Sequence, residues 1–444
     1  MPARNRPQPP RPRHRARAWI AVVMGVAAIL LGPLAAPARA DFAAGWAAFE
    51  AGDYQLARNH WMPLARAGDL DAMYDIATLY ENGYGVARST SRAIEWYRRA
   101  AARRFAPAQF RLGQMYAFGT GIARDFKKAL HWYERAAEQG YAEALFNLAV
   151  AYETGVDDSP DIARAIAYYR KAADQNFAPA QFNLGRLYAT GNGVTRDIAR
   201  AVALYRAAAE QGFAPAQNNL GYAYEKGIGL AADTAEAVRW YTRAAEQGFA
   251  TAQTNLGILL AFGTNIRRDY VAAARWFRAA ALTGDPVAQA NLGLLLANGQ
   301  GIERDPVEAH AWLLLAAEGD ANGAAYRDRL ANQLDEREIA AAARRASALR
   351  KTIAARELRP KRAQPRPTAD FARIEMTAQR YLKTLGLYTG AVDGMVGGGT
   401  RAAVRAFQRR AGLRADGRIT PALIEALAAA ARARAERAAA DAPS

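Results

Sequence analysis

The sequence predicts an all-α protein, in which a long α-solenoid of helix hairpins is followed by a small, separate three-helix module. Three observations support this prediction. Alanines, glycines and bulky pairs each recur with a step of 36 residues through the middle of the chain, and seven copies keep the same register. The pattern changes after residue 318, and an arginine- and proline-rich stretch at 359–370 then precedes a last segment with its own helical pattern. A repeat of this length indicates helical units that each cover the apolar face of the next unit.

The first forty residues have the features of a secretory signal peptide. Residues 1–40 contain seven arginines and no acidic residue, and an apolar run extends from Trp19 to Ala36. Small residues at Ala38 and Ala40 fit a signal-peptidase site, so we expect cleavage after Ala40 and export to the periplasm of a Gram-negative cell. The alternative is an uncleaved anchor, since a run of about 18 apolar residues just suffices to span a bilayer. Membrane contact is expected only in that case.

Three series of residues define the repeat. The small residues of the first helix are Ala72, Ala108, Ala144, Ala180, Ala216, Ala252 and Ala288. The glycines that follow them are Gly83, Gly119, Gly155, Gly191, Gly227, Gly263 and Gly299. The bulky pairs are Trp96-Tyr97, Trp132-Tyr133, Tyr168-Tyr169, Leu204-Tyr205, Trp240-Tyr241, Trp276-Phe277 and Trp312-Leu313. Small residues let helix backbones approach closely, and we expect the bulky pairs to fill the space between hairpins.

Each 36-residue unit is predicted to be a pair of helices. Proline stands near the expected start of the first helix in four units, and the repeated glycine, which can adopt a left-handed conformation, is expected to end that helix. An aspartate N-cap should start the second helix, at Asp125, Asp161, Asp197, Asp233, Asp269 and Asp305. Ser89 stands at this position in the first unit. In the last unit a proline follows Asp305, and Glu308 completes the sequence of a capping box.

The shared pattern reads A-x-x-x-L-G-x-x-Y-x-x-G-x-G-[VI]-x-x-D-x-x-x-A-x-x-W-Y-x-x-A-A and is nearly complete from Ala108 to Ala137. It resembles the Sel1-like repeat, a relative of the tetratricopeptide repeat, over residues 69–318. Residues 41–68, with a Gly-Asp-Tyr turn, resemble a degenerate hairpin that caps the array. Asp157 and Asn265 depart from the pattern at the second loop glycine. The resemblance implies a right-handed solenoid that acts as an adaptor for a protein partner rather than as a catalyst.

One polar position in the first helix is a candidate binding feature. Asparagine, a poor helix former, precedes the leucine of the first helix in five consecutive units. These residues are Asn147, Asn183, Asn219, Asn255 and Asn291. In tetratricopeptide relatives the matching asparagine holds the backbone of a bound peptide, and the first helices line the concave wall. The resemblance therefore implies a peptide groove. The alternative is that each amide ties one hairpin to the next.

The chain after the repeats is predicted to contain a helical cap and a linker. Residues 319–358 include apolar residues at three- and four-residue spacing, as in an amphipathic helix. We expect these helices to close the solenoid; a basic helix on a membrane surface is the alternative. Residues 359–370 are rich in proline and arginine and are expected to form a stiff, extended linker. Residues 431–444 form an alanine- and arginine-rich tail.

Residues 371–430 form the second module. The string Q-x-x-L-x-x-L-G-x-Y-x-G-x-V-D-G, followed by Ala406-Phe407-Gln408, resembles the small three-helix peptidoglycan-binding domain. From the residues, Phe407 is expected to be buried beside Leu382 and Val404, and a helix from Thr400 to Ala411 is expected to have Thr400 as its cap. Our candidate groove residues are Tyr388, Asp393, Gly394, Gly397 and Thr400. Loop amides and an aromatic ring suit muropeptide and sugar contacts, although turn stabilisation also explains Asp393.

Charge and composition exclude several classes of protein. The chain has 59 basic and 42 acidic residues, a formal charge of +17 and no cysteine, so disulfides and cysteine-ligated zinc are excluded. Removing the seven signal arginines leaves 52 basic residues and a charge of +10. Residues 344–444 hold 21 basic and 8 acidic residues, or +13, so residues 41–343 carry −3. The basic surplus therefore lies in the linker and last module, and we expect no nucleic acid partner, because export separates the protein from nucleic acid.

Motifs for catalysis are missing from the sequence. His60, His131 and His310 are single residues on predicted solenoid helices without metal-ligand spacing, and no serine stands in a G-x-S-x-G motif. We therefore expect no catalytic residue, cofactor or metal. The sequence favours an exported, non-catalytic adaptor that binds peptidoglycan through the last module and a protein through the solenoid. The alternative is a periplasmic regulatory or polysaccharide-export scaffold whose last module binds protein rather than glycan.

Overall fold

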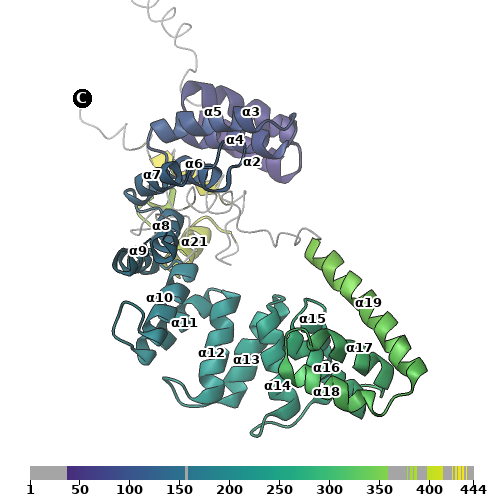
Figure 1. Ribbon diagram of the computed structural model, residues 1–444. Coiled ribbons are helices and arrows are strands. Elements are labelled where there is room, and N and C mark those ends of the chain that lie inside the picture. The colour runs from purple at the N-terminus through teal and green to yellow at the C-terminus, as the bar shows by residue number, and fades with distance from the viewer. Residues whose placement is uncertain are drawn as a thin grey trace, which may run out of the picture.

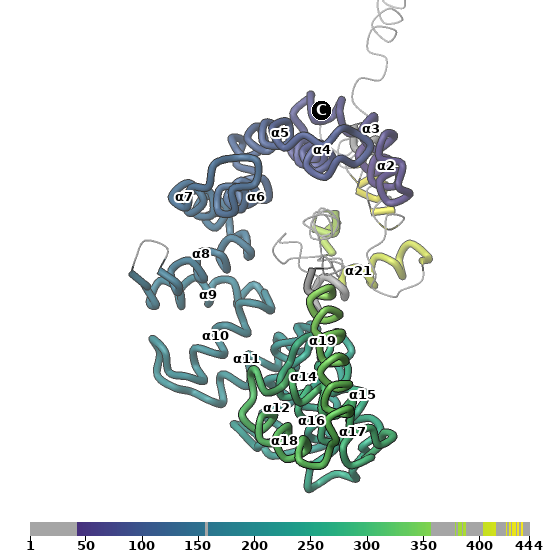
Figure 2. Tube along the Cα trace, turned by 45° about the vertical axis from the view of Figure 1, so that its right-hand side comes forward, coloured from purple at the N-terminus to yellow at the C-terminus, as the bar shows by residue number. Residues whose placement is uncertain are grey.

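The computed structural model describes residues 38–155 and 159–358, together with parts of the C-terminal module. The described parts of that module are residues 378, 381–383, 385–387, 398–413, 423, 426, 427, 429–431, 433, 434 and 437. Every regular element within these ranges is a helix, so the predicted all-α class is confirmed. Consecutive hairpins of residues 38–358 pack side by side into an open arc (Figures 1 and 2). Most of the predicted signal peptide, residues 1–37, lies outside the described residues.

Seven hairpins of closely similar length form the arc. They are α4 (Leu70–Asn82) with α5 (Thr90–Ala102), α6 (Ala106–Phe118) with α7 (Phe126–Ala137), α8 (Ala142–Thr154) with α9 (Ile162–Asp174), α10 (Ala178–Thr190) with α11 (Ile198–Glu210), α12 (Ala214–Lys226) with α13 (Thr234–Glu246), α14 (Ala250–Phe262) with α15 (Tyr270–Ala281), and α16 (Pro286–Asn298) with α17 (Pro306–Ala316). We number the repeats 1 to 7 in this order. Each second helix packs against the first helix of the next repeat.

The predicted glycine ends of the first helices are confirmed in six repeats. In those repeats the glycine adopts a left-handed conformation, and its N–H bonds to a carbonyl of the last turn. Gly263 of repeat 6 is the exception, with φ −60°. Five other repeats have a second loop glycine with positive φ, whereas repeat 6 has Asn265, which is not among the described residues with positive φ. Without that second left-handed residue the loop takes another path, and Gly263 is extended.

The predicted N-caps of the second helices are confirmed. Each aspartate side chain accepts a hydrogen bond from the backbone N–H three residues later, and Ser89 does the same for Arg92 at 3.4 Å. The reciprocal half of the capping box predicted at Asp305 is wrong. The Asp305 N–H donates to the Leu296 carbonyl at 3.1 Å, as the cap residue of every repeat donates to the residue nine positions earlier. The Glu308 carboxylate instead accepts from Trp312.

The bulky pairs pack as predicted, and their close approach to the first helix explains the small residues. Tyr97, Tyr169, Tyr241 and Phe277, the second members of four pairs, are fully buried. A Cβ added to Gly113 in the middle of α6 would lie 2.5 Å from the Tyr133 ring, which is too close for any substitution without movement. Glycine at this position therefore lets an aromatic ring rest on the helix backbone.

Additional helices cover both ends of the array. At the start, α2 (Ala38–Glu50) and α3 (Tyr54–Ala67) form the expected hairpin, in which Trp61 is buried and donates to the Phe42 carbonyl. At the other end α18 (Ala321–Ala331) and α19 (Glu336–Leu358) pack against α17. Ala342 and Ala346 of α19 are buried, whereas Ile339, near the start of the same helix, is exposed.

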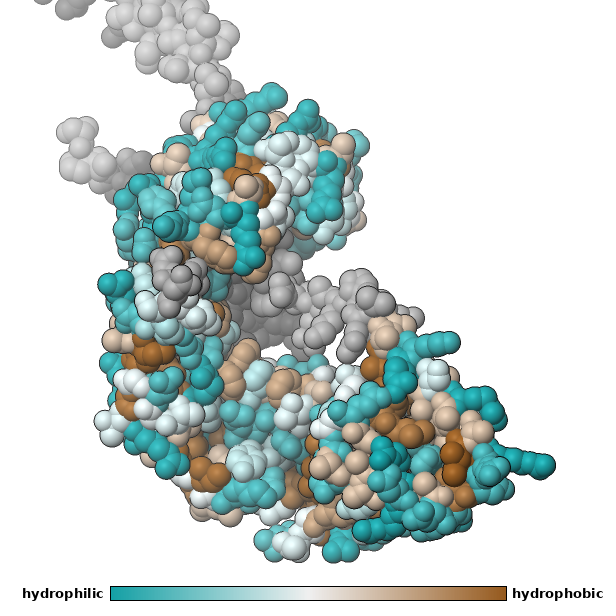
Figure 3. Space-filling model, in the orientation of Figure 1, coloured by the Kyte–Doolittle hydropathy of each residue, from teal (hydrophilic) through white to brown (hydrophobic). Residues whose placement is uncertain are grey.

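The described residues contain no helix that is both long and apolar enough to cross a bilayer. On the face seen in Figure 3 the solenoid is largely hydrophilic, with separate small apolar patches.

The described part of the C-terminal module has its own core. Phe407 and Val404 of α21 (Gly398–Arg410) are buried together with Leu382, as predicted, and Leu423 and Leu427 complete the cluster. α21 begins two residues before the expected start, so Thr400 lies in the first turn of the helix and not at its cap. The two glycines ahead of Thr400 adopt the helical conformation and extend the helix.

Candidate binding surfaces

The five candidate asparagines occupy one position on five successive first helices. In Figures 1 and 2 the first helices α4 and α6 lie on the inner side of the arc, and their partners α5 and α7 lie outside. All five asparagines are half-buried. The same position holds Asp75 in repeat 1 and Arg111 in repeat 2. The series therefore runs through all seven repeats, and its first two members are charged.

Several of these amides contact neighbouring hairpins. Asn147 hydrogen-bonds to Tyr133 of the preceding repeat, and Asn219 hydrogen-bonds to Tyr205 in the same way. Asn255 donates to the Asn218 side chain of the preceding repeat at 3.0 Å. Asn291 donates to the Val287 carbonyl of its own helix at 2.8 Å. Three of the five amides therefore link two repeats, which is the tie considered as the alternative to a peptide clamp.

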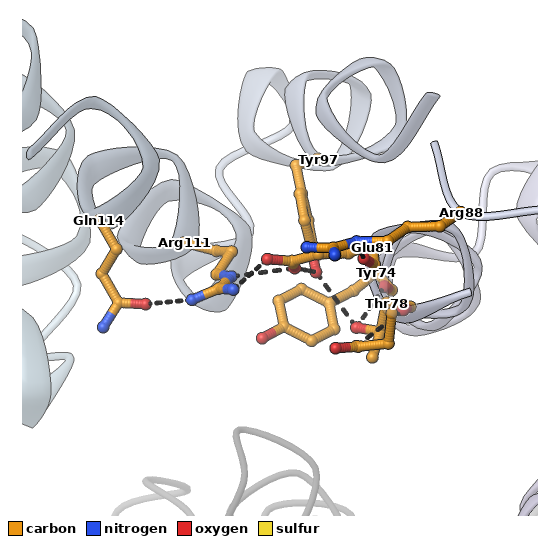
Figure 4. A network of polar contacts seen from close by, with 8 residues as sticks. Tyr74, Thr78, Glu81, Arg88, Tyr97, Arg111 and Gln114 are labelled. Carbon is orange, nitrogen blue, oxygen red and sulfur yellow. Dashed lines mark hydrogen bonds and ion pairs between the residues drawn. The ribbon is translucent and has the colours of Figure 1, made fainter. Parts of the chain in front are cut away.

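Arg111 forms a buried charged network instead of an amide contact (Figure 4). Its guanidinium pairs with Glu81 of repeat 1, with Nε 3.1 Å from Oε2, and donates to Gln114 at 2.9 Å. The buried Tyr97 hydroxyl donates to the same carboxylate at 2.9 Å and lies 3.2 Å from the Thr78 hydroxyl. A single carboxylate thus joins the two helices of repeat 1 and the first helix of repeat 2.

The contacts of the inner tyrosines alternate along the solenoid. In repeats 1, 3 and 5 the tyrosine donates to a glutamate of its own hairpin, at 2.9, 2.7 and 2.8 Å. These pairs are Tyr97 with Glu81, Tyr169 with Glu153, and Tyr241 with Glu225. In repeats 2 and 4 the residue at the glutamate position is alanine, and the tyrosine bonds to the asparagine of the next repeat. Arg186 adds an ion pair to Glu153.

Burial keeps these tyrosines protonated. It raises the pKa of Tyr133 to about 12, against the opposing effect of the Asn147 hydrogen bond. Burial also raises the pKa of Tyr97 and Tyr169, and the neighbouring carboxylates add to the effect. At neutral pH each hydroxyl is therefore a hydrogen-bond donor, which suits a carboxylate acceptor.

A second polar series, which the sequence analysis missed, ties the hairpins together elsewhere. Buried glutamines follow the repeated alanine in five repeats, and each Nε2 donates to a carbonyl of the preceding second helix. These residues are Gln109, Gln181, Gln217, Gln253 and Gln289. In repeats 2, 4 and 5 the glutamine oxygen also accepts from Gln139, Gln211 or Gln247 at 2.7 Å. The 36-residue spacing of both glutamine series was the available signal.

The histidines considered as ligands lie far apart along the chain, on three different helices. His60 lies on α3, His131 is exposed on α7, and His310 is buried on α17, where burial lowers its pKa. Across residues 38–155 and 159–358 and the described part of the C-terminal module, no three His, Asp or Glu side chains are grouped to hold a metal ion.

The candidate residues of the C-terminal module are mostly beyond what the structure describes. Tyr388, Asp393, Gly394 and Gly397 lie outside the described residues, and only the backbone of Thr400 is described.

The repeats match a known family over more than half of the chain. The Sel1 repeat model matches residues 70–104, 106–141, 142–177, 178–213, 214–249, 250–285 and 286–320. The chain belongs to the Sel1 repeat family. A second family model, described as a putative peptidoglycan binding domain, matches residues 376–427 of this Sel1 repeat protein.

Solved structures agree with the Sel1 assignment. The protein is similar to c5321 of uropathogenic Escherichia coli, described as a protective antigen displaying an SLR fold, with 31% identity and a TM-score of 0.63 over 71% of this chain and 70% of that one. It is also similar to a Sel1 repeat protein from Oxalobacter formigenes, with 35% identity and a TM-score of 0.51 over 53% of this chain and 97% of that one. No curated protein matches the chain.

Proposed function

We propose that this Sel1 repeat protein is an exported, non-catalytic adaptor, which binds peptidoglycan through its C-terminal module and a protein partner through the inner face of the solenoid. The observation that carries the proposal is the combination of a repeat solenoid, a fold that serves protein interaction, with a match to a peptidoglycan-binding domain in one chain. Such a pairing would act by raising the effective concentration of the partner at the wall.

The electrostatics support a wall-facing C-terminal end. Residues 344–444 hold 21 basic and 8 acidic residues, whereas residues 41–343 hold 31 and 34. Stem peptides and other anionic polymers of the cell envelope are suitable counterions for such a basic segment. Peptidoglycan lies outside the cytoplasmic membrane, so binding it requires export, for which residues 1–40 would supply the signal.

Sedimentation with isolated sacculi tests the wall-binding half of the proposal. Two purified chains are compared, residues 41–444 and residues 41–366, which lack the C-terminal module. We expect only the longer chain to sediment with sacculi. Equal sedimentation of both chains, or of neither, would show that the module does not anchor the protein to the wall.

Site-specific photo-crosslinking tests the solenoid half. A photoreactive amino acid replaces Asn183, which is half-buried on α10, the first helix of repeat 4, or Ala167, which is exposed on α9, the second helix of repeat 3. We expect a protein adduct in living cells from position 183 and none from position 167. Adducts from position 167 alone would place the partner on the outer face and refute the proposed groove.

A further inference from the structure

Two clusters of basic residues stand out on the edge of the solenoid formed by the hairpin turns. We define the Tyr188 cradle as Arg170, Arg196 and Arg200 around Tyr188, in repeats 3 and 4. Arg170 donates to the Tyr188 hydroxyl at 3.1 Å, and the Arg200 guanidinium lies over the Tyr188 ring at 4.6 Å from its centroid. Arg196 donates through Nε to the Ala189 carbonyl at 3.1 Å. Each arginine is thus held in place by a neutral group.

The arginines of the Tyr188 cradle have no acidic partner. None of them forms an ion pair within residues 38–155 or 159–358 or with the described part of the last module. Asp197 is the nearby acid in the turn, and its carboxylate accepts from the Arg200 backbone N–H as the helix cap. An open cavity of about 680 Å³ lies between these side chains. Fixed, unneutralised guanidinium groups around a cavity are a preorganised site for an anion.

Two of the three cations recur around a tyrosine two repeats earlier. We define the Tyr116 cradle as Arg98 and Lys128 around Tyr116. Arg124, at the position of Arg196, lies over the Phe126 ring instead, at 4.1 Å from its centroid. Arg98 donates to the Tyr116 hydroxyl at 3.3 Å, and the Lys128 ammonium lies 5.7 Å from the ring centroid. Lys128 also pairs with Asp125 at 3.0 Å, so two cations and one carboxylate leave a surplus of one positive charge, against two in the Tyr188 cradle.

Repeat 3, which lies between the two cradles, has lost the cluster. Glu134 stands at the position of Arg98 and Arg170, and Pro160 stands at the position of Arg124 and Arg196. The remaining cation, Arg164, is neutralised by Asp161 at 3.1 Å. The two cradles are therefore separate sites in equivalent positions, rather than parts of a continuous basic stripe.

We propose that the two cradles bind carboxylates of one acidic polysaccharide chain. Guanidinium groups match carboxylates in planar, two-point geometry. Two equivalent sites in a repeating scaffold fit a ligand whose charges also repeat, and a polysaccharide of uronic acid units has that property. This inference goes beyond the proposed function, because neither the inner groove nor the C-terminal module takes part in it.

The test compares variants of the 41–444 chain for binding to polygalacturonate, to its neutral methyl ester and to polyglutamate. Because the basic C-terminal end attracts any polyanion, the informative variant leaves the charge unchanged. In Tyr116→Phe with Tyr188→Phe, the arginines stay but lose their hydroxyl anchors. We expect polygalacturonate to bind roughly tenfold more weakly to this variant, as expected for loss of charge-assisted contacts. The methyl ester should not bind.

A second pair of variants controls for net charge and for stability. Arg170→Gln, Arg196→Gln and Arg200→Gln together should weaken binding by roughly tenfold or more. The control replaces the exposed Arg66, Arg267 and Arg275 by Gln and should change binding less than about twofold. Thermal melts check that each variant is folded. The three arginine substitutions of the Tyr188 cradle are at the surface, so their effect on binding can be measured even if the tyrosine substitutions destabilise the chain.

Three results would overturn the inference. They are unchanged affinity in both cradle variants, an equal loss in the control variant, and tighter binding of polyglutamate than of polygalacturonate, which would indicate an acidic peptide as the ligand. Sedimentation of the cradle variants with sacculi is measured in parallel. We expect the cradle substitutions to leave sedimentation with sacculi unchanged. Failure of this inference can therefore be distinguished from failure of the proposed wall anchor.

Discussion

The Glu81 carboxylate accepts the hydroxyl hydrogen of Tyr97 at 2.9 Å, in a site where both side chains are buried. Arg111 of the next repeat neutralises the same carboxylate. The relationship explains how charged residues stand on an inner helix of the solenoid without leaving a buried charge unpaired. It also makes the junction of repeats 1 and 2 dependent on one acidic residue.

Glu81→Gln should therefore lower the free energy of unfolding by about 2 kcal/mol, because Arg111 would lose its counterion in a partly buried site. The matched control is Glu225→Gln. Its carboxylate also accepts from a tyrosine, but its cation, Lys226, is exposed on the same helix, so the loss should stay below about 1 kcal/mol. Urea denaturation measures both. Equal losses would show that the Arg111 pair does not stabilise the junction.

Gly113→Ala should destabilise the protein by about 2 kcal/mol, although alanine is the better helix former, because the added Cβ would clash with the Tyr133 ring. Repeat 3 supplies the control, since Ala149 occupies the same position there. Ala149→Gly should cost only about 1 kcal/mol, the difference in helix propensity. A stabilising effect of Gly113→Ala in urea denaturation would contradict the packing described for α6.

Stability should fall as pH rises from 10 to 12. The pKa of Tyr133 is raised to about 12 in the folded protein, whereas the pKa of an unfolded tyrosine is close to its ordinary value of 10.0, so the unfolded chain releases its proton first. Each such tyrosine can reduce the free energy of unfolding by about 1.4 kcal/mol per pH unit in this window. Tyr133→Phe should show a shallower decline in urea midpoints than the natural chain. Identical declines would contradict the assigned shift.

Thr283→Gln should stabilise the protein by about 1 kcal/mol. The buried Gln253 oxygen has no hydrogen-bond partner in the described part of the chain, because Thr283 stands where repeats 2, 4 and 5 have the glutamine that donates to this atom. Thr283→Ala is the control and should give no gain, since it adds no donor. Thermal or urea denaturation that finds the Gln variant no more stable than the Ala variant would show that the glutamine link contributes nothing.

The predictable features were those that each repeat determines locally. Aspartate caps, glycine ends and the burial of Phe407 follow from residue type and spacing, and the structure confirms them. The partners of the inner side chains differ from one repeat to the next, so a consensus of single repeats conceals them. Glu81, Glu153 and Glu225 recur with a step of 72 residues, which is twice the repeat length. Their hydrogen bonds to tyrosine become evident only when the two helices of each hairpin are placed in contact.

The exceptions have the same origin. Gly263 matches the helix-end pattern but is extended, in a loop whose second residue is Asn265 rather than a left-handed glycine. The capping box at Asp305 fails because the carbonyl of Leu296, in the last turn of α16, accepts the N–H that Glu308 would need. The predicted groove of the C-terminal module stays a prediction, since Tyr388 and its neighbours lie outside the described residues.

The central claim is that one molecule holds its partner and the wall at the same time. The most direct test is to crosslink the partner from position 183 in cells, isolate sacculi under native conditions and measure the adduct in the wall fraction. We predict that the adduct of the 41–444 chain sediments with sacculi and that the adduct of the 41–366 chain stays in the supernatant. Sedimentation of both adducts, or an adduct of the longer chain that never reaches the wall fraction, would contradict the adaptor function.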